Sequence, residues 1–548
     1  MVAHTGTRAA PLRRGAASHP GARVSPGHPL PPSGGRRKLT RVTTPTGFIR
    51  ASALAVAIAS LARPAEVRAQ DEPIVTTRHT VTIGARTLRY TARAGRIPIR
   101  DNEAGDVHGQ MFFVSYTLDR PPTDPPRPLT FVWNGGPGSN AALVHLIGFG
   151  PKRIAPPPGA KPGDGTRWLI EPNPGSWLET TDLVFVDPIG TGYSRPTRAE
   201  YGAEFYQTRG DAESVAEFIR VYRTRFDALD APLFLAGESY GVTRAAGVAA
   251  ALGTRGTDVR GVILLGLALP LGSMSPAMQT ALGLPSLAVA AFTNEKLAPD
   301  LQRDLAATMK QAESWATSVY AGALARSDSL GAAERDSIVR GVSRFTGLDP
   351  ALVDRKTLTV DRMQLGNYLL RREGKFIGQY DTRMLGPLDT TQVPYDPTKD
   401  PSLQNLLDDV TVLRYLRTEL GYRSDLRYQG PFGGGYPPPT AFRGDWMSVK
   451  WKRVPGDSVA GERALEQAIR LNPTLRVLSG CGIYDLLCDY YGNVWSASHL
   501  EEAVRRNVIV YSYPGGHAMY TDPRAHLQLK ANVADFIRSA AAPPPRPN

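Results

Sequence analysis

Cysteine is scarce in this sequence, and no group of residues has the spacing of a metal site. Two cysteines, Cys481 and Cys488, occur among 548 residues, and they form neither a CxxC pair nor a group with histidine. Zinc sites need such groups, so we expect no metal, and nothing in the sequence calls for a nucleotide or another cofactor. The two cysteines are compatible with one local disulfide in an oxidising compartment or with two reduced thiols.

Excess positive charge is also missing from most of the chain. The formal net charge of +13 invites a nucleic-acid or membrane-surface partner. However, residues 1–69 contain eleven Lys and Arg residues against one acid, Glu66, which leaves about +3 for all the other residues. The basicity therefore belongs to the first residues, and we expect no nucleic-acid partner.

The apolar run near the N-terminus, 51–62, is too short to cross a bilayer, which needs about 20 residues. It follows a basic segment ending at Arg50 and precedes small residues up to Ala69, which is the layout of an export signal. We expect residues 1–69 to be a disordered leader plus export signal of a periplasmic or secreted protein that has no stable membrane insertion after signal removal. An N-terminal membrane anchor or a disordered tail is the alternative.

The remaining residues alternate between strand and helix patterns. Residues 74–118 alternate apolar and polar positions and predict antiparallel strands. Short, nearly all-apolar runs are typical of strands buried on both faces of a parallel sheet. These runs are 129–133, 183–186, 233–236 and 262–265, and the sheet is expected to resume with 475–479 and 508–512. Helical patterns at 210–226 and 240–253 lie between them and a last one covers 523–540, so we predict an α/β fold with a mostly parallel central sheet.

A mostly helical insertion interrupts this pattern at 272–460. Its long amphipathic stretches are 296–321, 331–346 and 403–420. We expect an α/β core in two parts, 70–271 and 461–548, with the insertion as a helical cap. A cap above the carboxyl edge of an open sheet places ligands between sheet and cap.

One five-residue pattern points to a nucleophile. Ser239 is the centre of Gly-Glu-Ser-Tyr-Gly at 237–241, between the apolar run 233–236 and a helical pattern. In this strand–turn–helix setting Gly-x-Ser-x-Gly forms a sharp turn that exposes the serine hydroxyl above the sheet edge, and the flanking glycines leave room for it. A glycine-rich turn without catalytic function would have a similar pattern.

A serine nucleophile needs a base, and the base needs an orienting carboxylate. His517 lies just past the apolar run 508–512 in a glycine-containing loop, whereas His499 and His526 fall within helical patterns and are expected at the surface. Asp485 follows the run 475–479 and is the expected acid; Asp489 is the alternative. The order Ser, acid, His is that of α/β-hydrolases.

A second loop has the composition of an oxyanion site. Residues 133–139 are Trp-Asn-Gly-Gly-Pro-Gly-Ser, so an apolar strand ends in a loop that exposes its backbone. Such a loop can aim an N–H at a tetrahedral oxyanion, with the N–H of Tyr240, the residue after the nucleophile, as the second donor.

Together these segments resemble the serine carboxypeptidases, peptidase family S10. The resemblance rests on Asn134-Gly-Gly-Pro-Gly, on Asp187-Pro-Ile-Gly-Thr-Gly-Tyr-Ser, and on the motifs around Ser239 and His517. It implies an α/β-hydrolase fold and a serine-type carboxypeptidase that releases C-terminal amino acids from peptides through an acyl-enzyme on Ser239. It further implies a catalytic triad, two oxyanion donors, and readers of the peptide's terminal carboxylate. These are Ser239, Asp485 and His517; Gly136 and Tyr240; and Asn134, Gly135 and Glu238.

Three positions depart from the pattern of many eukaryotic members. Ser139 stands where they have a disulfide-bonded cysteine, Ile147-Gly-Phe replaces a glutamate pair, and Ala518 follows the histidine. The second change weakens the expected support of Asn134 and Glu238. The resemblance is to a bacterial-type member of the family. Cys481 and Cys488 bracket Asp485, and a disulfide between them would rigidify the acid loop.

Two other functions are compatible with the same residues. An esterase or acyltransferase would use the same triad, because fold does not determine substrate. A binding protein without catalytic activity is the third hypothesis. A glutamate beside the nucleophile repels a peptide carboxylate when both are ionised, so we expect better activity at acidic than at alkaline pH if Glu238 reads that carboxylate.

Overall fold

The computed structural model describes residues 73–159, 167–267, 274–388, 400–403, 406–407, 409–430 and 462–542. The chain divides into a unit Met1–Arg68 and a unit Ala69–Asn548. The expected leader and export signal at 1–69 lie outside the described residues. Within the described helices, none is long and apolar enough to cross a membrane.

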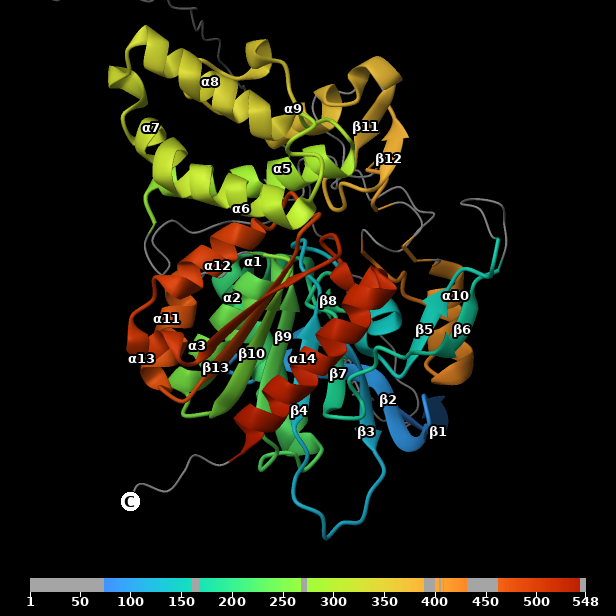
Figure 1. Cartoon of the computed structure of the whole chain (residues 1–548). Helices are drawn as coiled ribbons and strands as arrows, with labels where there is room; N and C mark the ends of the chain where they lie inside the picture. Colours follow the sequence, from blue (N-terminus) through green and yellow to red (C-terminus); the bar gives the residue numbers. More distant parts are fainter. Residues whose placement is uncertain are drawn as a thin grey trace, which may run out of the picture. The chain divides into compact units, whose positions relative to one another are not determined.

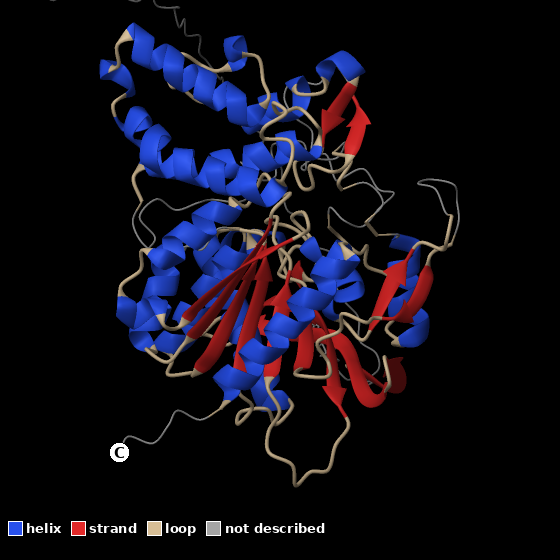
Figure 2. Ribbon diagram, in the orientation of Figure 1, coloured by secondary structure: helices blue, strands red, loops and turns tan. Residues whose placement is uncertain are grey.

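A ten-stranded sheet is the centre of the unit Ala69–Asn548 (Figures 1 and 2). Its main path in spatial order is β1 (Val75–Ile83), β2 (Arg86–Arg100), β3 (Val107–Leu118), β7 (Asp182–Val186), β4 (Leu129–Trp133), β9 (Leu233–Glu238), β10 (Val259–Leu265), β13 (Arg476–Gly482) and β14 (Val508–Tyr513), and β8 (Arg195–Pro196) pairs with β3. Pairs from β1 to β7 are antiparallel, and pairs from β7 to β14 are parallel. The predicted antiparallel strands and parallel apolar strands are both confirmed.

Burial explains why the parallel strands are continuous apolar runs. Every residue of β4 and β9 is buried, because helices cover both faces of the sheet there. β1 lies at the sheet edge and alternates exposed or half-buried residues with more buried ones. For β1, β4 and β9 the sequence period therefore agrees with how many faces of the strand are covered.

Two hydrophobic cores lie on the two faces of the sheet. On one face pack α2 (Thr208–Arg225), α3 (Gly241–Thr254) and α11 (Glu462–Leu471). On the other pack α14 (Pro523–Ala541), the π-helix η1 (Val144–Phe149), α10 (Asp409–Arg414) and η8 (Tyr415–Glu419). In Figure 1, α14 crosses the front of the sheet.

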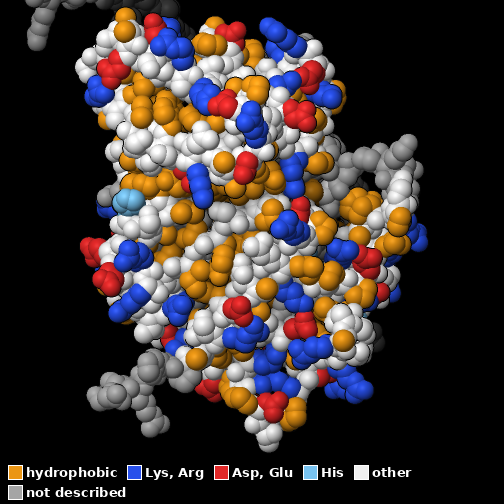
Figure 3. All heavy atoms as spheres, viewed as in Figure 1, with side chains coloured by type: hydrophobic (Ala, Val, Ile, Leu, Met, Phe, Trp, Pro, Cys, Tyr) orange, Lys and Arg blue, Asp and Glu red, His pale blue; other side chains and the backbone are white. Residues whose placement is uncertain are grey.

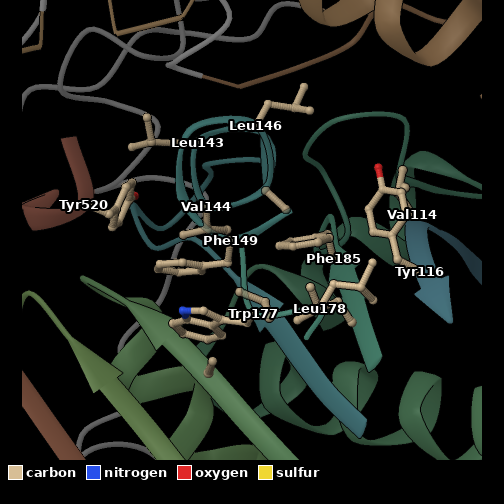
Figure 4. Close-up of a cluster of buried hydrophobic side chains, with 14 of the residues drawn as sticks. Val114, Tyr116, Leu143, Val144, Leu146, Phe149, Trp177, Leu178, Phe185 and Tyr520 are labelled. Atoms are coloured by element: carbon tan, nitrogen blue, oxygen red, sulfur yellow. The ribbon is translucent and has the colours of Figure 1, made fainter. Parts of the chain in front are cut away.

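The core around η1 supports the loop that follows β4. Figure 4 shows Leu143, Val144 and Phe149 of this segment facing Trp177 and Tyr520. The rings of Phe149 and Trp177 stack with centroids 3.8 Å apart. At residues 147–149, where many eukaryotic serine carboxypeptidases have a pair of glutamates, this chain therefore has apolar packing.

His526 differs from the prediction of a surface residue. It lies in the first turns of α14 but is 2% exposed, and its Nε2 lies 2.7 Å from the carbonyl oxygen of Gly148. Gly175 makes room for the imidazole, because a Cβ at that position would overlap the ring. The prediction failed because the polar ring is satisfied by a distant backbone carbonyl, which helical periodicity does not reveal. His499 is exposed, as expected.

A helical layer lies above the carboxyl ends of the parallel strands (Figure 1). It contains α4 (Pro276–Leu282), α5 (Leu284–Thr293), α6 (Leu305–Trp315), η3 (Ala316–Tyr320), α7 (Ala321–Ala325), α8 (Ala332–Thr346) and α9 (Arg362–Tyr368). A separate hydrophobic core joins these helices. The hairpin of β11 (Lys375–Ile377) and β12 (Leu385–Pro387) follows them.

Two details of the insertion differ from the sequence prediction. The helix expected from residue 296 begins only at Leu305, because the Asp304 carboxylate accepts hydrogen bonds from the N–H groups of Ala306 and Ala307 and so caps it there. In the stretch 403–420, α10 and η8 pack against the sheet core rather than the cap helices, and the Tyr415 hydroxyl lies 2.9 Å from that of Tyr116 in β3.

The remaining helices and strands connect these layers. They include β5 (Lys152–Ala155) paired with β6 (Leu169–Pro172), the short α1 (Gly202–Phe205), and α12 (Tyr490–Ser498) and α13 (Glu502–Arg505) between β13 and β14. On the face seen in Figure 3, basic and acidic side chains are interspersed.

Candidate active site

Ser239 lies in a sharp turn between β9 and α3. Its φ is +57°, a left-handed conformation that is uncommon for residues other than glycine. The turn is so tight that a Cβ at Gly237 would lie 1.9 Å from the carbonyl oxygen of Gly241. The Ser239 N–H donates to the carbonyl of Leu265 at the end of β10, 2.8 Å away. This contact explains the glycine at 237.

Asp485 and His517 form a buried pair. Nδ1 of His517 lies 2.7 Å from Oδ2 of Asp485, and the two residues, His517 and Asp485, are 4% and 0% exposed, respectively. The other carboxylate oxygen of Asp485 accepts the N–H of Leu487 at 2.7 Å. Gly266, which follows β10, leaves space for the imidazole, since a Cβ there would lie 3.3 Å from Cε1 of His517.

The second imidazole nitrogen is the one that a general base would use. Among the described residues, Nε2 of His517 has no hydrogen-bond partner, and Oε1 of Glu238 lies 3.9 Å from it. Burial disfavours a charged ring, but Asp485 and Glu238 outweigh this effect and raise the pKa of His517. The Asp485 carboxylate would stabilise the imidazolium formed when the ring accepts a proton.

Asp489, the alternative acid, has a different partner. Its carboxylate accepts hydrogen bonds from Nη2 of Arg362 in α9, at 2.7 and 2.6 Å. Arg362 also donates to the carbonyl of Leu486. Asp489 therefore links the acid loop to the cap, and Asp485 alone of the two contacts the imidazole.

The loop after β4 and the nucleophile turn approach each other closely. A Cβ at Gly135 would lie 2.4 Å from the backbone nitrogen of Tyr240 and 2.8 Å from Cβ of Ser239. Gly136 and Gly138 both have φ near +100°, which favours glycine. The two backbone segments expected to supply oxyanion donors are therefore side by side at the nucleophile.

Asn134 and Glu238 form a hydrogen-bonded pair next to Ser239. Nδ2 of Asn134 donates to Oε2 of Glu238 at 2.6 Å, and Oδ1 accepts the N–H of Val144 at 3.1 Å. Burial raises the pKa of Glu238, although His517 and Asn134 act in the opposite direction. Glu238 therefore holds its proton to a higher pH than an exposed glutamate, and a protonated carboxyl can donate a hydrogen bond.

A segment of the insertion, 378–384, contacts both the loop that carries His517 and the loop that carries Asp485. The N–H of His517 donates to the carbonyl of Tyr380 at 2.6 Å, and the N–H of Leu486 donates to that of Gln379 at 3.0 Å. The Tyr380 ring packs edge-on against the imidazole, with centroids 5.1 Å apart. Sequence reasoning missed this segment, because nothing in its residues indicates which loops it contacts.

The two cysteines are joined in a disulfide, with Cα atoms 5.9 Å apart. Both are fully buried, and the bridge closes a loop that contains Asp485. Of the two alternatives that the sequence left open, the structure contains the disulfide.

The described residues contain no group of three or more His, Cys, Asp or Glu side chains that could hold a metal ion. The arrangement at the carboxyl edge of the sheet instead combines a serine at a strained turn, a buried His–Asp pair and two backbone loops. Fold and site together define an α/β hydrolase of the serine type.

The family follows from comparison with known proteins. The family model described as serine carboxypeptidase, peptidase family S10, matches residues 92–417, more than half of the chain. The chain belongs to this family. The matched range includes Ser239 and the loop after β4 but ends before Asp485 and His517.

Curated relatives match over shorter stretches. The chain is 34% identical over 193 residues to the pheromone-processing carboxypeptidase KEX1 of Yarrowia lipolytica, which covers 35% of this chain and 28% of the relative. It is 32% identical over 157 residues to KEX1 of Saccharomyces cerevisiae, covering 27% and 20%. The matches thus span less than a third of the curated relatives' length.

A solved structure of the prohormone-processing carboxypeptidase KEX1 of S. cerevisiae is similar to this chain with a TM-score of 0.49 and 17% identity, and the similarity covers 82% of this chain and 91% of that one.

Proposed function

We propose that this protein is a bacterial-type serine carboxypeptidase that releases the C-terminal residue of peptides. The observation that carries the proposal is the buried Asn134–Glu238 pair, joined at 2.6 Å and adjacent to Ser239. Many serine hydrolases have a triad, but a protonated carboxyl beside the nucleophile supplies a hydrogen bond for a terminal carboxylate. Departures from the eukaryotic pattern, such as Ser139, support the bacterial type.

The reaction would proceed by acyl transfer. Ser239 Oγ attacks the last peptide carbonyl while Nε2 of His517 takes its proton, and Asp485 stabilises the resulting imidazolium. The N–H groups of Gly136 and Tyr240 stabilise the oxyanion. The C–N bond then breaks and His517 returns the proton to the departing amine. Water repeats the sequence on the acyl-enzyme and releases the shortened peptide.

A three-substrate comparison tests this function. An N-blocked dipeptide with a free C-terminus, the same dipeptide as its amide, and an acyl ester are each assayed with wild type and Ser239→Ala. We expect release of a free amino acid from the first substrate, much less hydrolysis of the amide, and no activity in the variant. Hydrolysis or transfer of the ester alone would identify an esterase or acyltransferase instead. No activity and no labelling by a fluorophosphonate would identify a binding protein.

We also propose that the protein is exported to the periplasm or the medium. The basic segment ending at Arg50, the apolar run 51–62 and the small residues up to Ala69 support this. N-terminal sequencing of protein from the cell exterior or periplasm tests it: a start near Gln70 is expected. Retention of residues 1–69 on a membrane-bound protein would contradict it.

A further inference from the structure

A buried ion pair lies behind the two oxyanion loops. Arg244 in α3 is 1% exposed and Asp211 in α2 is 2% exposed. Nε of Arg244 donates to Oδ2 of Asp211 at 2.7 Å. Arg244 is also the one charged residue in the sequence of α3, whose other residues are mostly Ala, Gly and Val.

Each member of this pair reaches a different loop. Nη1 of Arg244 donates to the carbonyl of Asn134 at 2.7 Å, which ties down the start of the loop after β4. The Tyr240 hydroxyl donates to Oδ2 of Asp211 at 3.3 Å. The Arg244 guanidinium also lies 5.1 Å from the centroid of the Tyr240 ring. One ion pair thus contacts both the Asn134 loop and the residue after the nucleophile.

Such a link has a chemical consequence. An oxyanion is stabilised only when its donors lie about 2.7–3.1 Å from the position that the charge takes up. The two donors expected here come from separate loops, so their separation must be maintained by a contact between the loops. The backbones at Gly135 and Tyr240 are in close contact, since a methyl group at Gly135 would overlap the backbone nitrogen of Tyr240.

We propose that Arg244 and Asp211 are positioning residues that hold the Asn134–Gly138 loop and Tyr240 at the separation required to stabilise the oxyanion. The effect is independent of the leaving group, so it applies equally to esters and peptides. It rests on the proposed function only in requiring an acyl transfer to Ser239, and not in requiring a peptide substrate.

A purely structural role makes a different prediction. Buried ion pairs are often replaced by apolar residues of similar size with little loss of stability, whereas removing one partner leaves an uncompensated charge. The double variant Asp211→Leu/Arg244→Met therefore removes the charges together and, with them, the contacts to Asn134 and Tyr240. If the pair is purely structural, the double variant should have both Tm and kcat close to those of wild type. If the pair positions the loops, the double variant should have a Tm close to wild type but a reduced kcat.

The experiment measures Tm, the fraction of protein labelled by a fluorophosphonate, and kcat and KM for an acyl ester and a blocked dipeptide. For the double variant we expect a near-wild-type Tm, a kcat per labelled site about 10- to 100-fold lower on both substrates, and a KM for the ester within about threefold of wild type. Arg244→Lys retains the charge but offers one ammonium group to two acceptors, so we expect an intermediate kcat.

The chain offers a matched control at the amino ends of the parallel strands, opposite the carboxyl ends where the site lies. Nε of Arg127 donates to Asp182 at 3.0 Å and Nη2 donates to the carbonyl of Leu178 at 2.7 Å, the same combination of acceptors. Asp182 pairs with the first residue of β4, whereas the site lies beyond the last residue of that strand. The double variant Asp182→Leu/Arg127→Met should therefore leave kcat unchanged.

The proposal is overturned if the folded Asp211→Leu/Arg244→Met variant has wild-type kcat, or if the control pair lowers kcat equally. Should the double variant not fold, a wild-type kcat in Arg244→Lys overturns it as well. A wild type that hydrolyses only the ester contradicts the carboxypeptidase function, while this test still proceeds on the ester.

Discussion

The two sides of Ser239 are held in different ways. On the oxyanion side, Asn134 and Tyr240 are tied to the ion pair of Asp211 and Arg244, all within the α/β core. On the base side, the loop carrying His517 is hydrogen-bonded to Tyr380, which belongs to the insertion. These contacts of the first side lie within the core, whereas the second side depends on a contact from the insertion.

This difference separates two tasks of the site. Stabilising an oxyanion requires fixed backbone donors, which helix N-termini and strand ends of the core supply. Orienting the base requires the loops that follow β13 and β14 to keep a fixed position relative to each other. The segment 378–384 contacts both loops. We infer that changes at the ion pair act on transition-state stabilisation, whereas changes in the segment 378–384 act through the position of His517.

The largest expected effect tests the base side directly. Asp485→Asn keeps the shape of the acid but favours the wrong imidazole tautomer, so kcat should fall about 10,000-fold with little change in KM. Steady-state kinetics on a blocked dipeptide measure this loss. Asp489→Asn is the control, because its partner is Arg362; a larger loss of kcat in the control would reverse the assignment of the acid.

A smaller effect tests the oxyanion side and its pH dependence. The pKa of Glu238 is raised by burial, so the carboxyl is neutral below that pKa and ionised above it. For substrates with a free carboxylate, kcat/KM should therefore fall as pH rises through the raised pKa. Glu238→Gln stays neutral and should remove this fall, with KM for the free acid changed by about tenfold at most at acidic pH.

The pH profile of the dipeptide amide is the control for Glu238, because this substrate carries no terminal charge. If kcat/KM fell with rising pH in the same way for the amide and the free acid, this would contradict a role of Glu238 in binding the carboxylate. A steady rise of kcat/KM to about pH 9 for the free acid would contradict it too.

The smallest effect tests the contribution of the insertion. Oδ2 of the buried Asp400 accepts the N–H of Gln379 at 2.7 Å and so supports the segment that holds His517. Asp400→Ala should lower kcat about three- to tenfold by loosening this segment, while oxyanion contacts stay intact. Asp336→Ala, which removes an exposed ion pair with Arg355 in the same insertion, is the control and should not change kcat.

An unchanged kcat in a folded Asp400→Ala variant would show that the base side does not depend on the insertion. Both sides of Ser239 would then be held by contacts within the core, and the contact between Tyr380 and His517 would not be needed for catalysis.

Much of the fold and the proximity of the expected site residues followed from local patterns. Asn134, Ser239 and Asp485 follow buried strands and His517 follows the half-buried edge strand β14, and parallel strands bring such positions to one edge. The sharp turn at Ser239 was predicted from the glycines at 237 and 241 between a strand and a helix. These features were predictable because each depends on a few consecutive residues.

Long-range contacts were not predictable in this way. The burial of His526 depends on the carbonyl of Gly148, and the choice between Asp485 and Asp489 depends on Arg362 in the insertion. Arg244 gave one sequence signal, a lone charge in an apolar helix, but its partners lie in α2 and after β4. Sequence spacing carries no information on such partners.

The sequence by itself determined the sheet, the turn at Ser239 and the set of residues at the carboxyl edge, because strand period and glycine placement are local properties. Only the tertiary structure decided which acid meets His517, what supports Asn134 in place of the missing glutamates, and which part of the insertion holds the base. Those contacts join residues far apart in the chain, 32 positions for Asp485 and His517 and 110 for Asn134 and Arg244, and they form only when the packed layers bring them within hydrogen-bond distance.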